Sequence, residues 1–138
     1  MIALSGCNTG EPEIVPVTGT LTLNGKPLAH AEISFVPMQE GLSGHYIATA
    51  VTDDQGKFTL KIPKGAGACA GENKVTVIEG PLPDEARGQS AKAQILASQF
   101  TAKLTNRPIP PQYASLAQSP LSVTVTKDQS DYPIDLKR

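Results

Sequence analysis

The sequence has no tryptophan, and only three phenylalanines and three tyrosines occur among its 138 residues. It also lacks an excess of basic side chains, because 12 lysines and arginines are balanced by 13 aspartates and glutamates. Proteins that neutralise nucleic-acid phosphates need a basic surface, so this balance argues against nucleic acid as a partner. No apolar run reaches the roughly 18–20 residues that a membrane-spanning helix requires.

Glycine and proline are abundant by contrast, with 12 of each. This composition favours short strands joined by many turns over a helical bundle. The length is that of one domain, which can bury about two-thirds of the surface of its extended chain.

From residue 15 onward, apolar and polar residues alternate in the manner of half-buried strands. Strands with one apolar face need a second sheet to cover it, so we expect an all-β fold, a seven-stranded antiparallel sandwich of two sheets. The last two strands are expected to form a hairpin around residues 127–130. The seven strands are marked by Val17, Leu21 and Leu23; Ile33 and Phe35; Ile47, Thr49 and Val51; Phe58, Leu60 and Ile62; Val75 and Val77; Leu121, Val123 and Val125; and Tyr132, Ile134 and Leu136.

Residues 84–108, between the fifth and sixth expected strands, break this alternation. Leu96, Phe100 and Leu104 are spaced four apart, which places them on one face of a helix. The prolines from Pro108 onward cannot continue that helix. We therefore predict a short helix or partly ordered insertion within a single domain of residues 15–138.

The N-terminal residues 1–14 carry the most specific functional signal. Leu4-Ser5-Gly6-Cys7 precedes a polar stretch and resembles the lipobox of bacterial lipoproteins, whose cysteine becomes the lipid-bearing first residue. An export signal needs a basic region and about 7–15 apolar residues, so Met1–Leu4 are interpreted as the tail of such a signal. We expect a lipid anchor on Cys7, a flexible tether, and a location at the cell envelope on the periplasmic or cell-surface side. The alternative is a chance match.

Four segments in order extend this interpretation. They are VTGTLTLNGKPL (17–28), AEISFVP (31–37), TDDQGKF (52–58), and IPPQY (109–113) leading to SPL (119–121). Together they are similar to the carboxypeptidase regulatory-like, or transthyretin-like, domain in the single-domain lipoprotein form abundant in planctomycete-type bacteria. The resemblance implies a prealbumin-like sandwich with no established enzymatic role. One departure is Asn73, where the family usually has an aromatic residue.

Structural roles account for the residues in these segments. Gly19 permits a close approach between strands, and Asp53 can cap its own turn ahead of Gly56, which takes a positive φ. Tyr113 can pack its ring while its hydroxyl finds a backbone acceptor. None of these roles requires a substrate.

The candidate residues for enzymatic chemistry do not form a recognisable set. Intradiol dioxygenases share the sandwich architecture and hold iron with two tyrosines and two histidines. Here His45 and Tyr46 are adjacent and would point to opposite faces of a strand, and His30 has no second histidine nearby in the sequence. The remaining tyrosines are Tyr113 and Tyr132. We expect no metal, no cofactor and no catalytic residue.

Three further features also give no sign of a catalytic or metal site. Asp53-Asp54 lacks the spacing of a calcium-binding EF-hand loop. Cys69 has no histidine or basic residue beside it that would activate its thiol. The transthyretin-like hydroxyisourate hydrolases end in Tyr-Arg-Gly-Ser, whereas this chain ends in Asp135-Leu136-Lys137-Arg138.

The sequence therefore predicts a non-enzymatic, lipid-anchored envelope protein whose sandwich is a structural or protein-interaction module. Its expected partners are the membrane and an envelope protein or glycan. An alternative is a carbohydrate- or peptide-binding domain that uses loop 38–46, with His45 and Tyr46 as ligand-binding residues. A metal-dependent enzyme on the same fold is a further alternative, and an exposed strand edge is another route to a partner.

Overall fold

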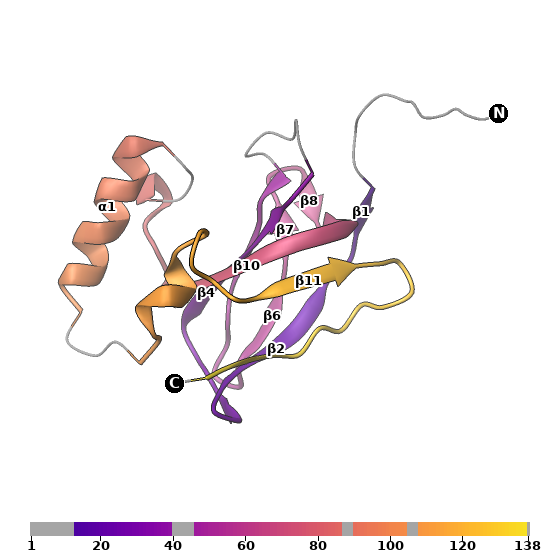
Figure 1. Cartoon of the computed structure of the whole chain (residues 1–138), viewed down its shortest axis with the longest axis horizontal. Coiled ribbons are helices and arrows are strands. Elements are labelled where there is room, and N and C mark those ends of the chain that lie inside the picture. Colours follow the sequence, from indigo (N-terminus) through magenta and orange to yellow (C-terminus); the bar gives the residue numbers. More distant parts are fainter. Residues whose placement is uncertain (1–12, 40–45, 87–89, 105–107, 138) are drawn as a thin grey trace.

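The computed structural model describes residues 13–39, 46–86, 90–104 and 108–137. These residues form a mostly β structure with one α-helix, α1 (Ala91–Ala102), and short 3₁₀ turns that include η3 (Asp84–Ala86) and η4 (Pro111–Ala114) (Figure 1). The strands are β1 (Ile14–Val15), β2 (Thr18–Leu23), β3 (Lys26–Pro27), β4 (Ala31–Pro37), β5 (Ala48–Val51), β6 (Lys57–Thr59), β7 (Lys61–Ile62), β8 (Gly65–Ala66), β9 (Ala68–Cys69), β10 (Gly71–Glu79), β11 (Ser122–Val125) and β12 (Ile134–Leu136).

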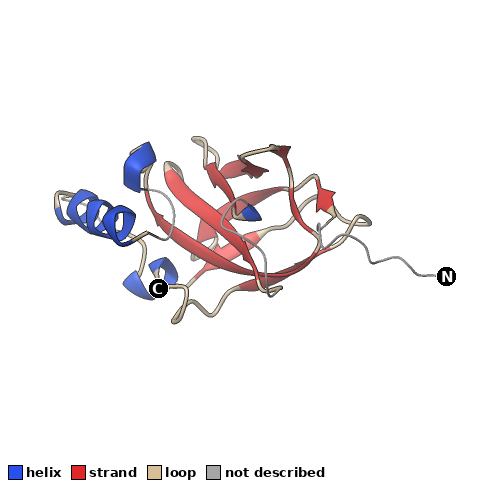
Figure 2. Ribbon diagram, turned by 90° about the horizontal axis from the view of Figure 1, so that it is seen from above, coloured by secondary structure: helices blue, strands red, loops and turns tan. Residues whose placement is uncertain are grey.

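The strands form three sheets. The largest has six strands in the order β11-β10-β4-β5-β7-β8, and a four-stranded sheet has the order β12-β2-β3 with β6 also paired to β2. β1 and β9 form a small antiparallel pair. Figure 2 shows the helices gathered at one end of the molecule, with the strands filling the rest.

One hydrophobic cluster lies beneath both large sheets. The expected alternation places Leu21, Ile33, Phe35 and Leu136 in this cluster, and all four are fully buried. Phe35 also contacts Phe58, with ring centroids 6.4 Å apart. The strand positions inferred from apolar alternation are confirmed for these residues.

Two turns have the chemistry that their sequences predict. Asn24 and Gly25 join β2 to β3 with φ values of 51° and 85°, the left-handed backbone that these residues tolerate. The Asp53 carboxylate accepts hydrogen bonds from the backbone N–H groups of Gln55 and Lys57, each at 2.9 Å. Gly56 follows with a φ of 81°, so Asp53 caps this turn as expected.

The strand count differs from the expected seven, because the structure describes twelve strands. Much of the difference comes from segments that change partners. Residues 57–62, expected to be one strand, divide at Leu60 into β6, which pairs with β2, and β7, which pairs with β5. The Leu60 N–H donates to the Val17 carbonyl oxygen, while the Leu60 carbonyl accepts from Gly67 N–H, each at 2.9 Å. The chain therefore crosses from one sheet to the other at this residue.

The predicted terminal hairpin is wrong, and so is uniformly antiparallel pairing. β11 pairs antiparallel with β10, whereas β12 pairs parallel with β2 in the other large sheet. Residues 126–133 connect them, and the Tyr132 hydroxyl bonds to Thr126 and Gln129 backbone groups within that connection. β11 and β12 therefore belong to different sheets, β11 to the six-stranded one and β12 to the four-stranded one.

The third expected strand buries the opposite set of alternate side chains from the set predicted. Ala48 is fully buried, whereas Val51 is 39% exposed, so Ile47, Thr49 and Val51 face away from the core. Ala48 lies directly opposite Phe35 across the β4–β5 ladder. The large Phe35 ring leaves room for only a small inward neighbour, which favours alanine there.

α1 lies within the predicted insertion of residues 84–108, but its expected apolar face is not buried. Ser90 caps the helix by accepting a hydrogen bond from Ala93 N–H at 3.1 Å. Ala93 and Thr101 are the buried residues of α1, whereas Leu96 and Phe100 are half-buried and Ile95 is 57% exposed. The helix packs against η3 through a small-residue face and leaves larger apolar side chains open. Among the described residues, no helix has the length and apolar character needed to span a membrane.

Candidate functional site: a groove on the outer face of the six-stranded sheet

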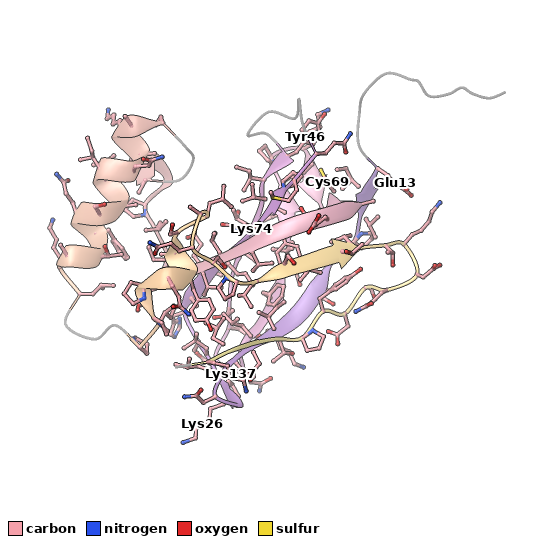
Figure 3. The ribbon with its side chains drawn as sticks, viewed as in Figure 1. Glu13, Lys26, Tyr46, Cys69, Lys74 and Lys137 are labelled. Carbon is pink, nitrogen blue, oxygen red and sulfur yellow. The ribbon has the colours of Figure 1, made fainter. Side chains whose placement is uncertain are left out.

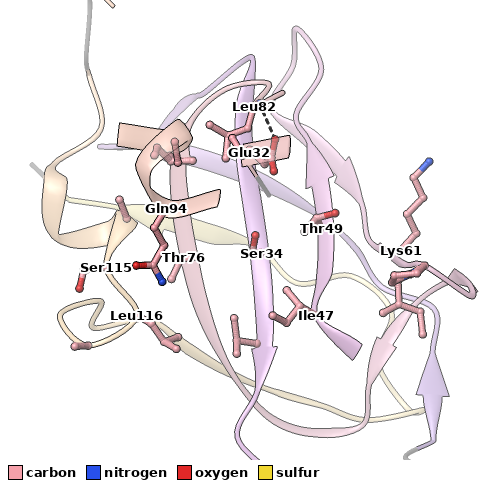
Figure 4. Close-up of a pocket in the computed structure, with 18 residues that line it drawn as sticks. Glu32, Ser34, Ile47, Thr49, Lys61, Thr76, Leu82, Gln94, Ser115 and Leu116 are labelled. Atoms are coloured by element: carbon pink, nitrogen blue, oxygen red, sulfur yellow. Dashed lines mark hydrogen bonds between the residues drawn. The ribbon is translucent and has the colours of Figure 1, made fainter. Parts of the chain in front are cut away.

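The most prominent hollow of the described structure lies on the face of the six-stranded sheet opposite the core. Its volume is about 1260 Å³. The outward residues of β4, β5 and β10 form its floor, α1 and the segment around η4 form one wall, and β7 forms the other (Figure 4). We refer to it as the outer-face groove. It is lined by Glu32, Ser34, Val36, Ile47, Thr49, Lys61, Ile62, Pro63, Thr76, Ile78, Leu82, Ala86, Gln94, Ala97, Ala114, Ser115, Leu116 and Ala117.

A row of polar side chains crosses the floor from one strand to the next. Thr76 of β10 lies opposite Ser34 of β4, Ser34 lies opposite Thr49 of β5, and Thr49 lies opposite Lys61 of β7. Residues directly opposite each other on neighbouring strands lie on the same face of a sheet, so these four side chains share one face. We call Thr76, Ser34, Thr49 and Lys61 the polar row.

Aliphatic residues lie on both sides of the polar row. Ile78 lies on one side of it, in the neighbouring cross-strand row of the sheet, in which Ile78 pairs with Glu32 and Glu32 pairs with Val51. Val36 and Ile47 lie on its other side and also line the groove. The floor is therefore a polar band that has Val36 and Ile47 on one side and, on the other, Ile78 next to the buried Glu32.

The hydroxyls of the polar row are available for a ligand. Within the ranges that the structure describes, no side-chain hydrogen bond involves Ser34, Thr49 or Thr76, and Lys61 has no ion pair. Each hydroxyl can both donate and accept, and the three are half-buried on an open surface. The row can therefore offer donors and acceptors at regular intervals.

The accessible charge of the groove is positive. Glu32 is only 3% exposed, and its Oε1 accepts a hydrogen bond from Leu82 N–H at 2.9 Å. Lys61 is exposed at the opposite rim (Figure 4). An adjoining hollow of about 620 Å³ shares Glu32, Thr49 and Lys61 with the groove and adds Lys57 and Asp53. The Asp53 carboxylate is already held by two backbone N–H groups, which lower its pKa.

Tyr46 is the one residue proposed from sequence as a site that the structure describes, and it lies elsewhere. Cys7 and His45 fall outside the described residues. Tyr46 is half-buried against the core, and Lys64 Nζ lies 5.6 Å from its ring centroid, a cation–π contact that occupies one face of the ring. Figure 3 shows Tyr46 and Cys69 at the end of the strands near Glu13, far from Lys26 and Lys137. Tyr46 does not line the groove.

The histidine and tyrosines considered for iron are dispersed. His30 is exposed and its Nε2 lies 3.4 Å from Asp54 Oδ1. Tyr113 and Tyr132 are buried, with their hydroxyls bonded to backbone groups. Over the described ranges, no three histidine, cysteine, aspartate or glutamate side chains are grouped as metal ligands would be.

Cys69 of β9 and Asn73 of β10 are both buried, and the Asn73 side chain is hydrogen-bonded to the Cys69 backbone. Burial raises the pKa of the Cys69 thiol. Asn73 is fully buried; its Nδ2 donates to the carbonyl oxygens of Cys69 and Gly71 at 2.9 and 3.0 Å, and its Oδ1 has no partner among the described residues. β10 is nevertheless continuous from Gly71 to Glu79.

The groove was missed at the sequence level because the outward-facing positions were treated as ordinary solvent-exposed residues. Val36 and Ile78 occupy outward positions on β4 and β10. Once the phase of β5 is corrected, Val51 does so on β5 and Ile47 does so just before it. Aliphatic residues repeated in the outward phase of neighbouring strands were the signal that could have revealed it.

Comparison with protein-family models found no match to the chain. Comparisons with curated proteins and with solved structures found no significant similarity either.

Proposed function

We propose that the protein is a non-enzymatic binding module of the cell envelope and that its binding surface is the outer-face groove. The observation that carries this proposal is the polar row, in which three unengaged hydroxyls and Lys61 lie in register with aliphatic side chains beside them. Ligand sites combine such apolar surface with a few well-placed polar groups. A surface that only covers a core has no need of this arrangement.

We further propose that the two large sheets form a prealbumin-like sandwich and that the chain is related to carboxypeptidase regulatory-like domains. Two features support the sandwich. Both sheets contribute to one hydrophobic cluster, and the chain passes from one sheet to the other at Leu60. The family proposal depends on the four sequence segments described above.

The proposed lipid anchor on Cys7 is compatible with the position of the groove. β1 lies at the opposite end of the molecule from α1 in both ribbon views (Figures 1 and 2). An anchor ahead of β1 would therefore attach at the end of the molecule that lies away from the α1 wall of the groove. Loop 38–46, with His45 and Tyr46, remains the alternative binding surface, but the contact between Tyr46 and Lys64 leaves less of that ring for stacking.

Labelling with a palmitate analogue in the native host tests the anchor. We expect Cys7→Ser to abolish the label and Cys69→Ser to retain it, because Cys69 is buried. Label that persists in Cys7→Ser would contradict the proposed anchor.

Photo-crosslinking tests the groove independently of what it binds. A photoreactive amino acid at Thr49, in the polar row, should form adducts in intact cells. The same amino acid at Thr124, an exposed position of β11 outside the groove, should form none. Absence of adducts at Thr49, or equal adducts at both positions, would contradict a binding role for the groove.

A further inference from the structure

The groove also indicates what kind of ligand it takes, if the binding role proposed above is correct. We propose that it binds a linear anionic polysaccharide lying across the strands, with sugar hydroxyls against the polar row and an acidic group at the Lys61 rim. Three features of the groove lead to this ligand class: the direction of the polar row, the aliphatic side chains beside it and the exposed Lys61.

The direction of the polar row sets the direction of the ligand. Neighbouring strands lie about 4.8 Å apart, so four strands place the polar row along about 14 Å perpendicular to the chain direction. A ligand that crosses the strands meets one hydroxyl on each of β10, β4 and β5 and then the Lys61 ammonium. A chain of sugar rings presents hydroxyls repeatedly along its length, and each hydroxyl of the row can donate to it or accept from it.

The aliphatic side chains beside the polar row suit the carbon–hydrogen faces of sugar rings. Val36 and Ile47 flank the polar row on one side, and Ile78, the cross-strand partner of Glu32, flanks it on the other. An acyl chain would cover Ser34, Thr49 and Thr76 with apolar surface and leave three hydroxyls unsatisfied, which costs free energy. The polar row therefore argues against a purely apolar ligand.

Among the described residues, none that lines the groove is aromatic. Proline-rich peptides dock in grooves lined by aromatic side chains, so this class does not fit. Extended peptides usually bind to a sheet by adding a strand at its edge, whereas this groove lies on the face. A polysaccharide can bind to the face of the sheet because it does not need to pair with the backbone of an edge strand.

Charge selects an acidic polysaccharide. Lys61 has no ion pair among the described residues, and Lys57 lies in the adjoining hollow. Of the nearby carboxylates, Glu32 is nearly fully buried and accepts from Leu82 N–H, whereas Asp53 is exposed, stays ionised and offsets the charge of Lys57. Lys61 is therefore the cation that a carboxylate on the ligand would meet, through a charge-assisted hydrogen bond.

Calorimetric titration with a defined oligomer of galacturonic acid tests this proposal. We expect measurable binding that weakens with added salt, no binding of a neutral galactose oligomer of equal length, and weaker binding of hexaglutamate. Lys61→Met should reduce affinity about tenfold, the effect of losing one charge-assisted hydrogen bond. Ser34→Ala combined with Thr49→Val should also weaken binding.

Lys26→Met is the matched control, because Lys26 is exposed on β3 at a distance from the groove (Figure 3). It should leave affinity unchanged, and thermal melting should show that every variant is folded. Equal binding of the neutral oligomer, equal binding of hexaglutamate, or an equal loss with Lys26→Met would overturn the ligand class. If no oligomer binds but Thr49 still crosslinks in cells, the ligand class is wrong and the binding role stands; if neither occurs, both fail.

Discussion

The Tyr113 hydroxyl and the Lys137 backbone are joined by two hydrogen bonds. The hydroxyl donates to the Lys137 carbonyl oxygen at 3.1 Å and accepts from Lys137 N–H at 2.9 Å. These bonds tie η4, which precedes β11, to the residue that follows β12. Because the Tyr113 ring is buried in the shared cluster, the same side chain packs in the core and fixes the end of the chain.

Tyr113→Phe should lower the free energy of unfolding by about 1–2 kcal/mol, since it removes two hydrogen bonds worth about 0.5–1.5 kcal/mol each while keeping the ring. Urea unfolding followed by circular dichroism measures this. Tyr46→Phe is the matched control: no hydrogen bond involves the Tyr46 hydroxyl within the described ranges, so it should change stability by less than about 0.5 kcal/mol. Equal effects would contradict the role of the Tyr113 hydroxyl.

Gly19→Ala should destabilise the protein by about 1–3 kcal/mol, the usual cost of overpacking. A Cβ at this position would lie 2.3 Å from the Tyr132 carbonyl oxygen and 2.5 Å from Phe58 Cζ. Its cost should be smaller in a Phe58→Leu background, because the shorter side chain relieves part of the clash. Strict additivity of the two substitutions in urea unfolding would show that the Phe58 ring is not the obstacle.

Asp135 should make stability depend on pH in the acidic range. Lys137, the Thr22 hydroxyl and Gly25 N–H together lower its pKa to about 2 from the ordinary value of 3.8. The carboxylate therefore stabilises the folded state above about pH 4. This contribution is lost as the pH falls towards 2, because the folded state then also takes up the proton.

Asp135→Asn should accordingly lower the melting temperature at neutral pH, and the difference from the wild type should shrink between pH 4 and pH 2. Asp128→Asn, which removes an exposed carboxylate in the turn before β12, is the control for net charge. A difference that grows on acidification would show that the sign is wrong.

Cys69 should react slowly with thiol reagents in the folded protein. Its side chain is buried, and burial raises its pKa, so little thiolate is present at neutral pH. In a Cys7→Ser background, reaction with a chromogenic disulfide at pH 8 should be roughly a hundredfold or more slower than in denaturant, because it must wait for local opening. Rapid reaction of the folded protein would mean that β9 opens readily.

Local rules were sufficient for the positions of strands and turns but not for their pairing. The alternation around Leu21 and Phe35, the Asn24-Gly25 turn and the Asp53 cap each depend on residues close in sequence. By contrast, the divided strand at Leu60 and the parallel partner of β12 depend on contacts between distant segments. Hydrophobic alternation says which side of a strand is buried but does not say which strand lies next to it.

The phase of β5 shows why the groove was missed at the sequence level. By hydrophobicity alone Ile47 and Val51 belong inside, yet the volume of Phe35 across the ladder places Ala48 there. Once the phase is reversed, Ile47 and Thr49 join Ser34 and Thr76 on the outer face. The polar row forms only because four separate strands align side by side. No single stretch of sequence contains the information about that alignment.

The parallel pairing of β12 with β2 bears on how the chain acquires its structure. Residues near the two ends, such as Thr22 and Ile134, must meet before the four-stranded sheet is complete. Contacts between such distant residues form slowly, and this one cannot form on the ribosome until residues 134–136 have emerged. Nascent chains should therefore stay incompletely folded up to that point, which leaves them accessible to chaperones and to any machinery that threads an extended polypeptide.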